Sequence, residues 1–142
     1  KIGEIDFDNL NLEKGSYWNI FKAYGNTKLM NVIITKELGR IVQNENIITY
    51  LLHPGVIKTN ITHMNNGPVT FCLNVIAKMF GLTVEQGAIN TLYPILSPEN
   101  KETGKYYNEG IEEEPNKVAN DPGLAKKLWD VSKQILKDHR MI

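Results

Sequence analysis

A long apolar helix pattern followed by a short β-branched run constrains this 142-residue chain more than any other feature. Apolar residues between Ala23 and Val42 occupy nearly the whole circumference of a helix, which predicts a helix that is buried on more than one side. Asn46–Leu52 is rich in β-branched residues and ends at His53-Pro54-Gly55, where proline removes a ladder donor and glycine frees the backbone. A strand that is apolar on both faces, after a helix of crossover length, predicts an α/β fold with a parallel sheet.

Local signals place the other elements. Residues 1–22 are polar and irregular, which predicts a loop. The apolar segment Val69–Phe80 predicts a helix at the position of a mobile lid. Thr83 and Gln86 form a capping box, which predicts a helix that ends near Pro98.

Two further elements are expected near the C-terminal end of the chain. Gly104–Tyr107 predicts a short final strand. Asp121-Pro122 predicts the start of a last amphipathic helix, because Leu124, Leu128, Val131 and Ile135 follow at helical spacing. The chain contains no linker that would divide it into domains.

Charge and cysteine content exclude several classes of protein. The net charge is zero and no stripe of lysine and arginine occurs, so nucleic acid is not an expected partner. The acidic run Glu112–Glu114 predicts a solvated loop. The single cysteine, Cys72, excludes an internal disulfide, and the three histidines lack metal-ligand spacing, so no metal site is expected.

Tyr24 and Lys28 are the strongest candidates for chemistry. Residues four apart on a helix share a face, so the lysine ammonium can lie beside the phenol and favour its ionised form. A free tyrosine titrates near ~10, and a positive neighbour makes proton exchange with an alcohol or carbonyl more efficient near neutral pH. No Gly-x-Gly-x-x-Gly loop, which a dinucleotide needs for its pyrophosphate, occurs in the sequence.

In its order of motifs the chain resembles the C-terminal half of a short-chain dehydrogenase/reductase, in the branch of the retinol dehydrogenases and the WW-domain oxidoreductase. Five stretches carry the resemblance: Ile5–Leu10, Ala23–Asn31, His53–Thr59, Thr103–Tyr107 and Lys127–Ser132. It implies one Rossmann-like domain with a doubly wound parallel sheet, of which residues 1–142 are the C-terminal part. The glycine-rich cofactor half is then expected to be absent from this chain.

The resemblance also implies roles for individual residues. Tyr24 is expected to be the general acid/base, with Lys28 favouring its ionised form and holding the nicotinamide ribose. Cofactor contacts are expected from Pro54, Gly55, Ile57 and Thr59, in addition to Tyr24 and Lys28. Thr27 stands where the branch usually has serine, and this change is expected to have little effect.

The function implied is an NAD(P)-dependent oxidoreductase that interconverts an alcohol and a carbonyl on an apolar, retinoid- or lipid-like substrate. NADP is preferred over NAD from the branch alone. The expected location is the cytoplasm, or a membrane surface that faces the cytosol and is reached through N-terminal sequence absent here. The expected partner is a second copy of the chain or the missing N-terminal half.

Two alternatives stay open. The chain can be a truncated, non-catalytic fragment or an interaction module that cannot bind cofactor alone, because a half sheet leaves an edge and an apolar face unpaired. The extended branch that epimerises nucleotide sugars shares the Tyr-x-x-x-Lys spacing. The Pro54-Gly55 turn and the segment around Trp129 argue against this second alternative.

Overall fold

The computed structural model describes residues 5–10, 14, 20–58 and 75–141 of the chain. The chain divides into two compact units. The first contains Lys1–Thr49, Thr103–Lys105 and Glu114–Ile142, and the second contains Tyr50–Glu102 and Tyr106–Glu113. Thr59 and the first part of the predicted Val69–Phe80 helix lie outside the described residues.

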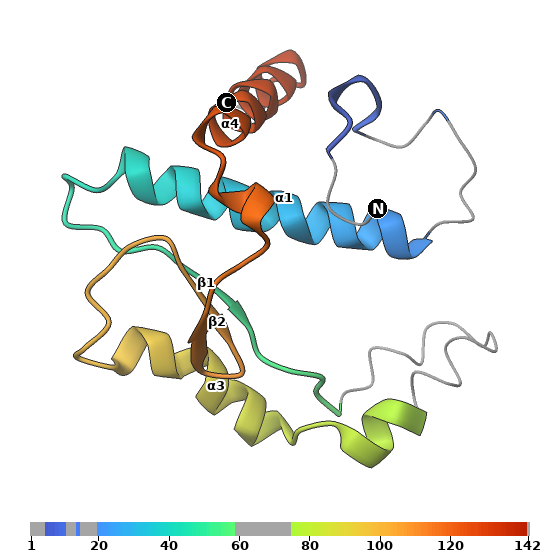
Figure 1. The fold of residues 1–142 in the computed structure, drawn as a ribbon, viewed down its shortest axis with the longest axis vertical. Coiled ribbons are helices and arrows are strands. Elements are labelled where there is room, and N and C mark those ends of the chain that lie inside the picture. Colours follow the sequence, from blue (N-terminus) through green and yellow to red (C-terminus); the bar gives the residue numbers. More distant parts are fainter. Residues whose placement is uncertain (1–4, 11–13, 15–19, 59–74, 142) are drawn as a thin grey trace. The chain divides into compact units, whose positions relative to one another are not determined.

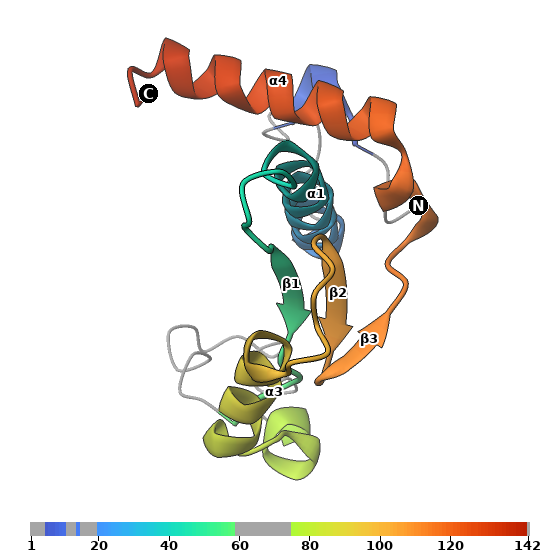
Figure 2. The same cartoon turned by 90° about the vertical axis from the view of Figure 1, so that its left-hand side faces the viewer.

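The first unit is built around the helices α1 (Ile20–Ile41) and α4 (Pro122–Asp138), and Figure 2 shows α4 lying across α1. Its core contains Ile33, Ala119 and Ala125, all with no exposed surface, together with Leu29 and Leu128. Two short 3-10 helices complete the unit, η1 (Phe7–Asn9) and η3 (Lys117–Asn120). Because the apolar side chains of α1 and α4 meet in this core, the helix pair fixes the orientation of α1.

Both ends of α1 differ slightly from the prediction. The helix begins at Ile20, inside the stretch predicted as a loop, and ends at Ile41. Ile33 is fully buried, whereas Leu38 and Ile41 are exposed. The helix therefore has a buried face against α4 and an exposed apolar portion near its C-terminus.

The predicted start of α4 is confirmed. The side chain of Asp121 accepts hydrogen bonds from the backbone N–H groups of Gly123 at 2.8 Å and Leu124 at 3.1 Å. Pro122 occupies the first helical turn, where its missing N–H would have no partner in any case. An aspartate N-cap followed by proline is thus a local start signal that the fold retains.

The second unit contains a three-stranded sheet in the order β1-β2-β3. The strands are β1 (Tyr50–His53), β2 (Lys105–Asn108) and β3 (Ile111–Glu113). The arrows of β1 and β2 point the same way in Figure 2, and β3 pairs antiparallel with β2. The fold is therefore α/β, as predicted, and the small sheet is mixed.

The strand β3 corrects two predictions, because β2 is not the final strand and the acidic run is not all loop. Asn108 pairs with Ile111, and the two residues between them have positive φ, 52° at Glu109 and 84° at Gly110. Positive φ at both central residues is the geometry of a tight hairpin turn. Glutamate-rich segments have low strand propensity, so the local sequence concealed a strand that the hairpin stabilises.

β1 is shorter than the predicted strand. Residues 46–49 are not part of it, and Asn46 has a positive φ of 55° in the turn that precedes the strand. The ring of Tyr50 packs edge to face on that of Tyr107 in β2, with 5.9 Å between centroids. The strand thus starts where it gains a neighbour in the sheet.

The helix α3 (Val84–Leu96) completes the second unit and begins as predicted. Thr83 Oγ1 accepts from the Gln86 N–H at 3.2 Å, and the Gln86 side chain accepts from the Thr83 N–H at 2.9 Å. This reciprocal pair is a complete capping box. Residues 75–80 are helical as well.

Candidate functional site

Tyr24 and Lys28 lie in the first turns of α1, on the same side of the helix. The Lys28 Nζ atom is 5.4 Å from the centroid of the Tyr24 ring, within cation–π distance. Tyr24 is 61% exposed, so a small molecule can reach its hydroxyl group. The structure therefore brings together the phenol and the ammonium that the spacing predicted.

The opposite face of this helical segment is buried. Asn26, between Tyr24 and Lys28 in sequence, is 8% exposed, and it precedes Leu29 and Ile33 on the face that contacts the core. Its Oδ1 atom is buried without a hydrogen-bond partner in the part of the chain that the structure describes. The core contacts of Leu29 and Ile33 fix the rotation of α1 and hence the direction of Tyr24 and Lys28.

Pro54, Gly55 and Ile57 lie in the irregular segment Pro54–Lys58 directly after β1, which we call the turn although it contains no hydrogen-bonded turn. Gly55 has a φ of 94°, which a residue with a side chain rarely adopts. A Cβ atom at Gly55 would lie 2.7 Å from Leu82 Cδ1 and 3.0 Å from Glu109 Oε1. The positive φ favours glycine here, and a Cβ atom would require the side chains of Leu82 and Glu109 to move.

A single parallel bridge continues this turn. The Lys58 N–H donates to the Leu82 carbonyl at 3.0 Å, and the Leu82 N–H donates to the Val56 carbonyl at 2.8 Å. The N–H and C=O of one peptide group point in opposite directions, so the N–H and C=O of Ile57 face away from Leu82 and take no part in these two bonds. One donor and one acceptor on the same residue match a primary carboxamide such as that of nicotinamide. The turn therefore fits the cofactor group that the sequence motifs imply.

The helix α3 supports this turn at two points that the sequence did not predict. The side chain of Ile57 fills the space beside Gly87, where a Cβ atom would lie 2.8 Å from Ile57 Cγ1. The Asn90 Nδ2 atom donates to the Pro54 carbonyl at 3.1 Å. Asn90 lacks a local sequence signal, because its acceptor is 36 positions away along the chain.

The predicted site residues thus fall into two groups. Tyr24 and Lys28 belong to the first unit, and Pro54, Gly55 and Ile57 belong to the second. The predicted cofactor residue Thr59 lies outside the described residues. Geometry is therefore defined within each group, and the roles predicted for these residues stay predictions.

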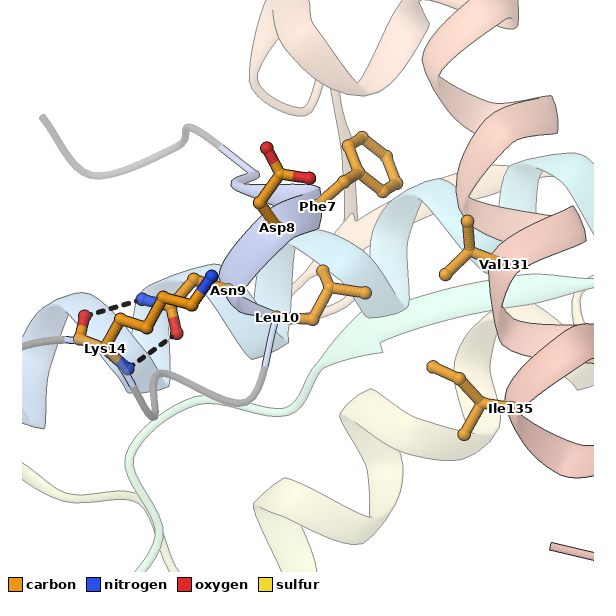
Figure 3. Close-up of a pocket in the computed structure, with 7 residues that line it drawn as sticks. All are labelled: Phe7, Asp8, Asn9, Leu10, Lys14, Val131 and Ile135. Carbon is orange, nitrogen blue, oxygen red and sulfur yellow. Dashed lines mark hydrogen bonds between the residues drawn. The ribbon is translucent and has the colours of Figure 1, made fainter. Parts of the chain in front are cut away.

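A pocket of about 260 Å³ lies in the first unit. Figure 3 shows it between the η1 segment and α4, lined by residues 7–10, Lys14, Val131 and Ile135. Asn9 closes one end, because its side chain donates to the Lys14 carbonyl at 2.7 Å and accepts from the Lys14 N–H at 2.9 Å. None of the predicted catalytic or cofactor residues lines this pocket.

The described residues 5–10, 14, 20–58 and 75–141 contain neither a metal-binding cluster nor a membrane-spanning helix. No group of three or more histidine, cysteine, aspartate or glutamate side chains there could hold a metal ion. No helix within those ranges is long and apolar enough to cross a membrane.

Comparison with known proteins decides the family. Retinol dehydrogenase 14 of Homo sapiens is 36% identical over 135 residues, which cover 93% of this chain and 40% of that protein. A short-chain dehydrogenase/reductase of Aspergillus calidoustus is 30% identical across the whole chain, and this match covers 47% of its own length. The WW domain-containing oxidoreductase of Danio rerio is 30% identical over 96% of the chain and 33% of its own length. The chain belongs to the short-chain dehydrogenase/reductase family.

No family model matches the chain. The chain spans less than half the length of the three relatives above. The predicted family and its retinol dehydrogenase and WW-domain oxidoreductase branch are nevertheless confirmed by these relatives, as is the Rossmann-like α/β fold. Short-chain dehydrogenases/reductases use a nicotinamide cofactor, NAD or NADP.

Proposed function

We propose that the protein is an NAD(P)-dependent oxidoreductase that interconverts an alcohol and a carbonyl, with Tyr24 as general acid/base and Lys28 as its assistant. The observation that carries this proposal is the exposed phenol with an ammonium 5.4 Å from its ring, in a chain of this family. The fixed rotation of α1 holds both groups on one accessible face. The same proposal assigns cofactor contacts to Tyr24, Lys28, Pro54, Gly55, Ile57 and Thr59.

The chain's own residues would handle the proton. In reduction, the Tyr24 hydroxyl donates its proton to the substrate oxygen as the carbonyl carbon becomes an alcohol carbon, and in oxidation it recovers that proton. In this proposal Lys28 assists by placing its ammonium group beside the phenol, 5.4 Å from the centroid of the Tyr24 ring. A bound nicotinamide supplies or accepts the hydride.

We propose an apolar substrate of the retinoid or lipid class, and NADP as the preferred cofactor. Support for the substrate comes from a relative of the chain, the retinol dehydrogenase 14 of Homo sapiens. We also place the protein in the cytoplasm or on a cytosolic membrane surface, as a homo-oligomer. The exposed apolar side chains of residues 75–96, such as Phe80 and Leu96, support association with a further surface.

The test is the substitution Tyr24→Phe in the full-length protein. We expect turnover of all-trans-retinal with NADPH to fall by about 10²–10⁴-fold, the usual contribution of a positioned acid/base. The dissociation constant for NADPH, measured by nicotinamide fluorescence, should stay within about twofold, since one hydroxyl group contributes little to uniform binding. Tyr93→Phe is the matched control, because Tyr93 is also exposed and lies on α3.

Retained turnover in the Tyr24→Phe variant would overturn the catalytic assignment. The alternative function, a non-catalytic interaction module, is favoured by the same exposed apolar residues between positions 75 and 96. It predicts that the wild-type protein binds neither NADPH nor NADH. Saturable binding of either nucleotide would exclude that alternative.

A further inference from the structure

Two residues on one face of α3 hold the turn after β1. Gly87 and Asn90 are three positions apart, so they lie on the same side of the helix. Gly87 receives the Ile57 side chain, and Asn90 donates its hydrogen bond to the Pro54 carbonyl. The helix therefore fixes the turn on both sides of Gly55.

The hydrogen bond from Asn90 acts on one specific peptide group. The Pro54 carbonyl belongs to the peptide that joins Pro54 to Gly55, and glycine at φ 94° leaves this peptide free to rotate in the absence of a restraint. The bond is 3.1 Å long and partly buried, so water competes for it only in part. Asn90 thus restricts the rotation of the peptide between Pro54 and Gly55.

The Asn90 side chain is itself held in place. Its Oδ1 atom lies against the hairpin turn, where a Cβ atom at Gly110 would be 3.5 Å away. The adjacent Glu109 N–H donates to the His53 carbonyl at 2.8 Å, immediately before Pro54. The amide of Asn90 therefore sits between the turn and the hairpin, with its donor directed at Pro54.

We propose that Asn90 is a positioning residue for the nicotinamide end of the cofactor. It sets the Pro54–Gly55 peptide, and through the turn it sets the direction of the N–H and C=O of Ile57, which take no part in the two bonds to Leu82. Those two main-chain groups would pair with the carboxamide of a bound nicotinamide. This inference rests on the proposed function, since it concerns the same cofactor contacts.

The test compares Asn90→Asp with Asn90→Ala in the full-length protein. Asn90→Asp keeps the shape of the side chain but replaces its donor with an oxygen that repels the Pro54 carbonyl. Asn90→Ala removes the donor without adding a charge. Thr91→Ala is the matched control, because Thr91 donates to the Gly87 carbonyl within the same helix at 2.8 Å and does not reach the turn.

Three quantities are measured for each variant: the dissociation constant of NADPH, that of 2′-phospho-ADP-ribose, which lacks nicotinamide, and the melting temperature. We expect both Asn90 variants to bind NADPH about tenfold more weakly, as loss of roughly one well-placed hydrogen bond predicts. Binding of 2′-phospho-ADP-ribose should change by less than about twofold in every variant. Thr91→Ala should leave both dissociation constants at their wild-type values.

Equal weakening of both ligands would overturn the proposal, because a merely structural role affects both ends of the cofactor site. Wild-type NADPH binding by both Asn90 variants would overturn it as well, while leaving the proposed function intact. If the wild-type protein binds neither NADPH nor NADH, the proposed function fails and this inference fails with it. The wild-type measurement therefore separates the two failures.

Discussion

The contact between Gly87 and Ile57 gives the sharpest test of the packing beneath the turn. Gly87 is buried in α3, and a Cβ atom there would overlap Ile57 Cδ1 and lie 2.8 Å from Ile57 Cγ1. Real Cβ atoms do not approach a carbon this closely, so the side chain or the helix must move. We therefore expect Gly87→Ala to destabilise the protein although alanine favours helices.

Two opposing effects determine how much Gly87→Ala changes the free energy of unfolding. Forcing a methyl group into a packed site costs about 1–3 kcal/mol. Replacing glycine with alanine within a helix stabilises the helix by about 0.5–1 kcal/mol. The net loss of unfolding free energy should be about 1 kcal/mol, which lowers the melting temperature of a chain of this size by about 4 °C.

The decisive measurement is a double-mutant cycle by urea denaturation with Gly87→Ala, Ile57→Ala and the pair. Without the Ile57 side chain the overlap disappears, so Gly87→Ala should become stabilising by about 0.5–1 kcal/mol. Ala88→Gly, at the neighbouring exposed position of α3, is the control. It should lower the free energy of unfolding by the same amount in the wild-type protein and in the Ile57→Ala variant, because only helix propensity changes. An equal effect of Gly87→Ala in both backgrounds would refute the reasoning.

The remaining predictions concern one titration and one helix cap. Burial and, second, the charge of Glu113 opposite it in the β2–β3 pair raise the pKa of Tyr106 above its ordinary value. Since the unfolded phenol titrates near ~10, the contribution of Tyr106 to stability is complete below that pH and is lost as the pH rises through the higher folded value. Absorbance titration near 295 nm should show a late tyrosine that Glu113→Gln shifts only in part, because burial is the larger cause, and that Glu112→Gln does not shift. Asp121→Ala should cost about 0.5–2 kcal/mol in urea denaturation, as loss of an N-cap does, because two backbone N–H groups lose their acceptor. Asp121→Asn keeps an acceptor and should retain most of the stability, so equal losses in the two variants would contradict the capping role.

The helix starts were predictable because their signals are local. A capping box joins Thr83 to Gln86, and the Asp121 side chain accepts from N–H groups two and three residues ahead. Such bonds depend on neighbours in the sequence and persist in almost any fold. The start of α1 was placed three residues late, because the region before Ala23 lacks a clear cap signal.

The strand pairing was predictable only in part. The β-branched run after α1 indicated β1, but its first residues lie in a turn, and β3 was missed within the acidic run. A strand forms where a partner supplies its hydrogen bonds, and the partner of β3 is set by the Glu109-Gly110 turn. Composition alone therefore misjudged a segment whose neighbour decides its structure.

For the candidate site, the sequence by itself determined the Tyr24 and Lys28 pair, because helical spacing of four residues places them on one face. It also determined that Gly55 must follow Pro54 in a turn. Tertiary structure alone decided that Asn90 and Gly87 hold this turn from α3. The physical reason is that contacts between residues dozens of positions apart arise only when packing brings their elements together, and they leave no periodic or local pattern in the chain.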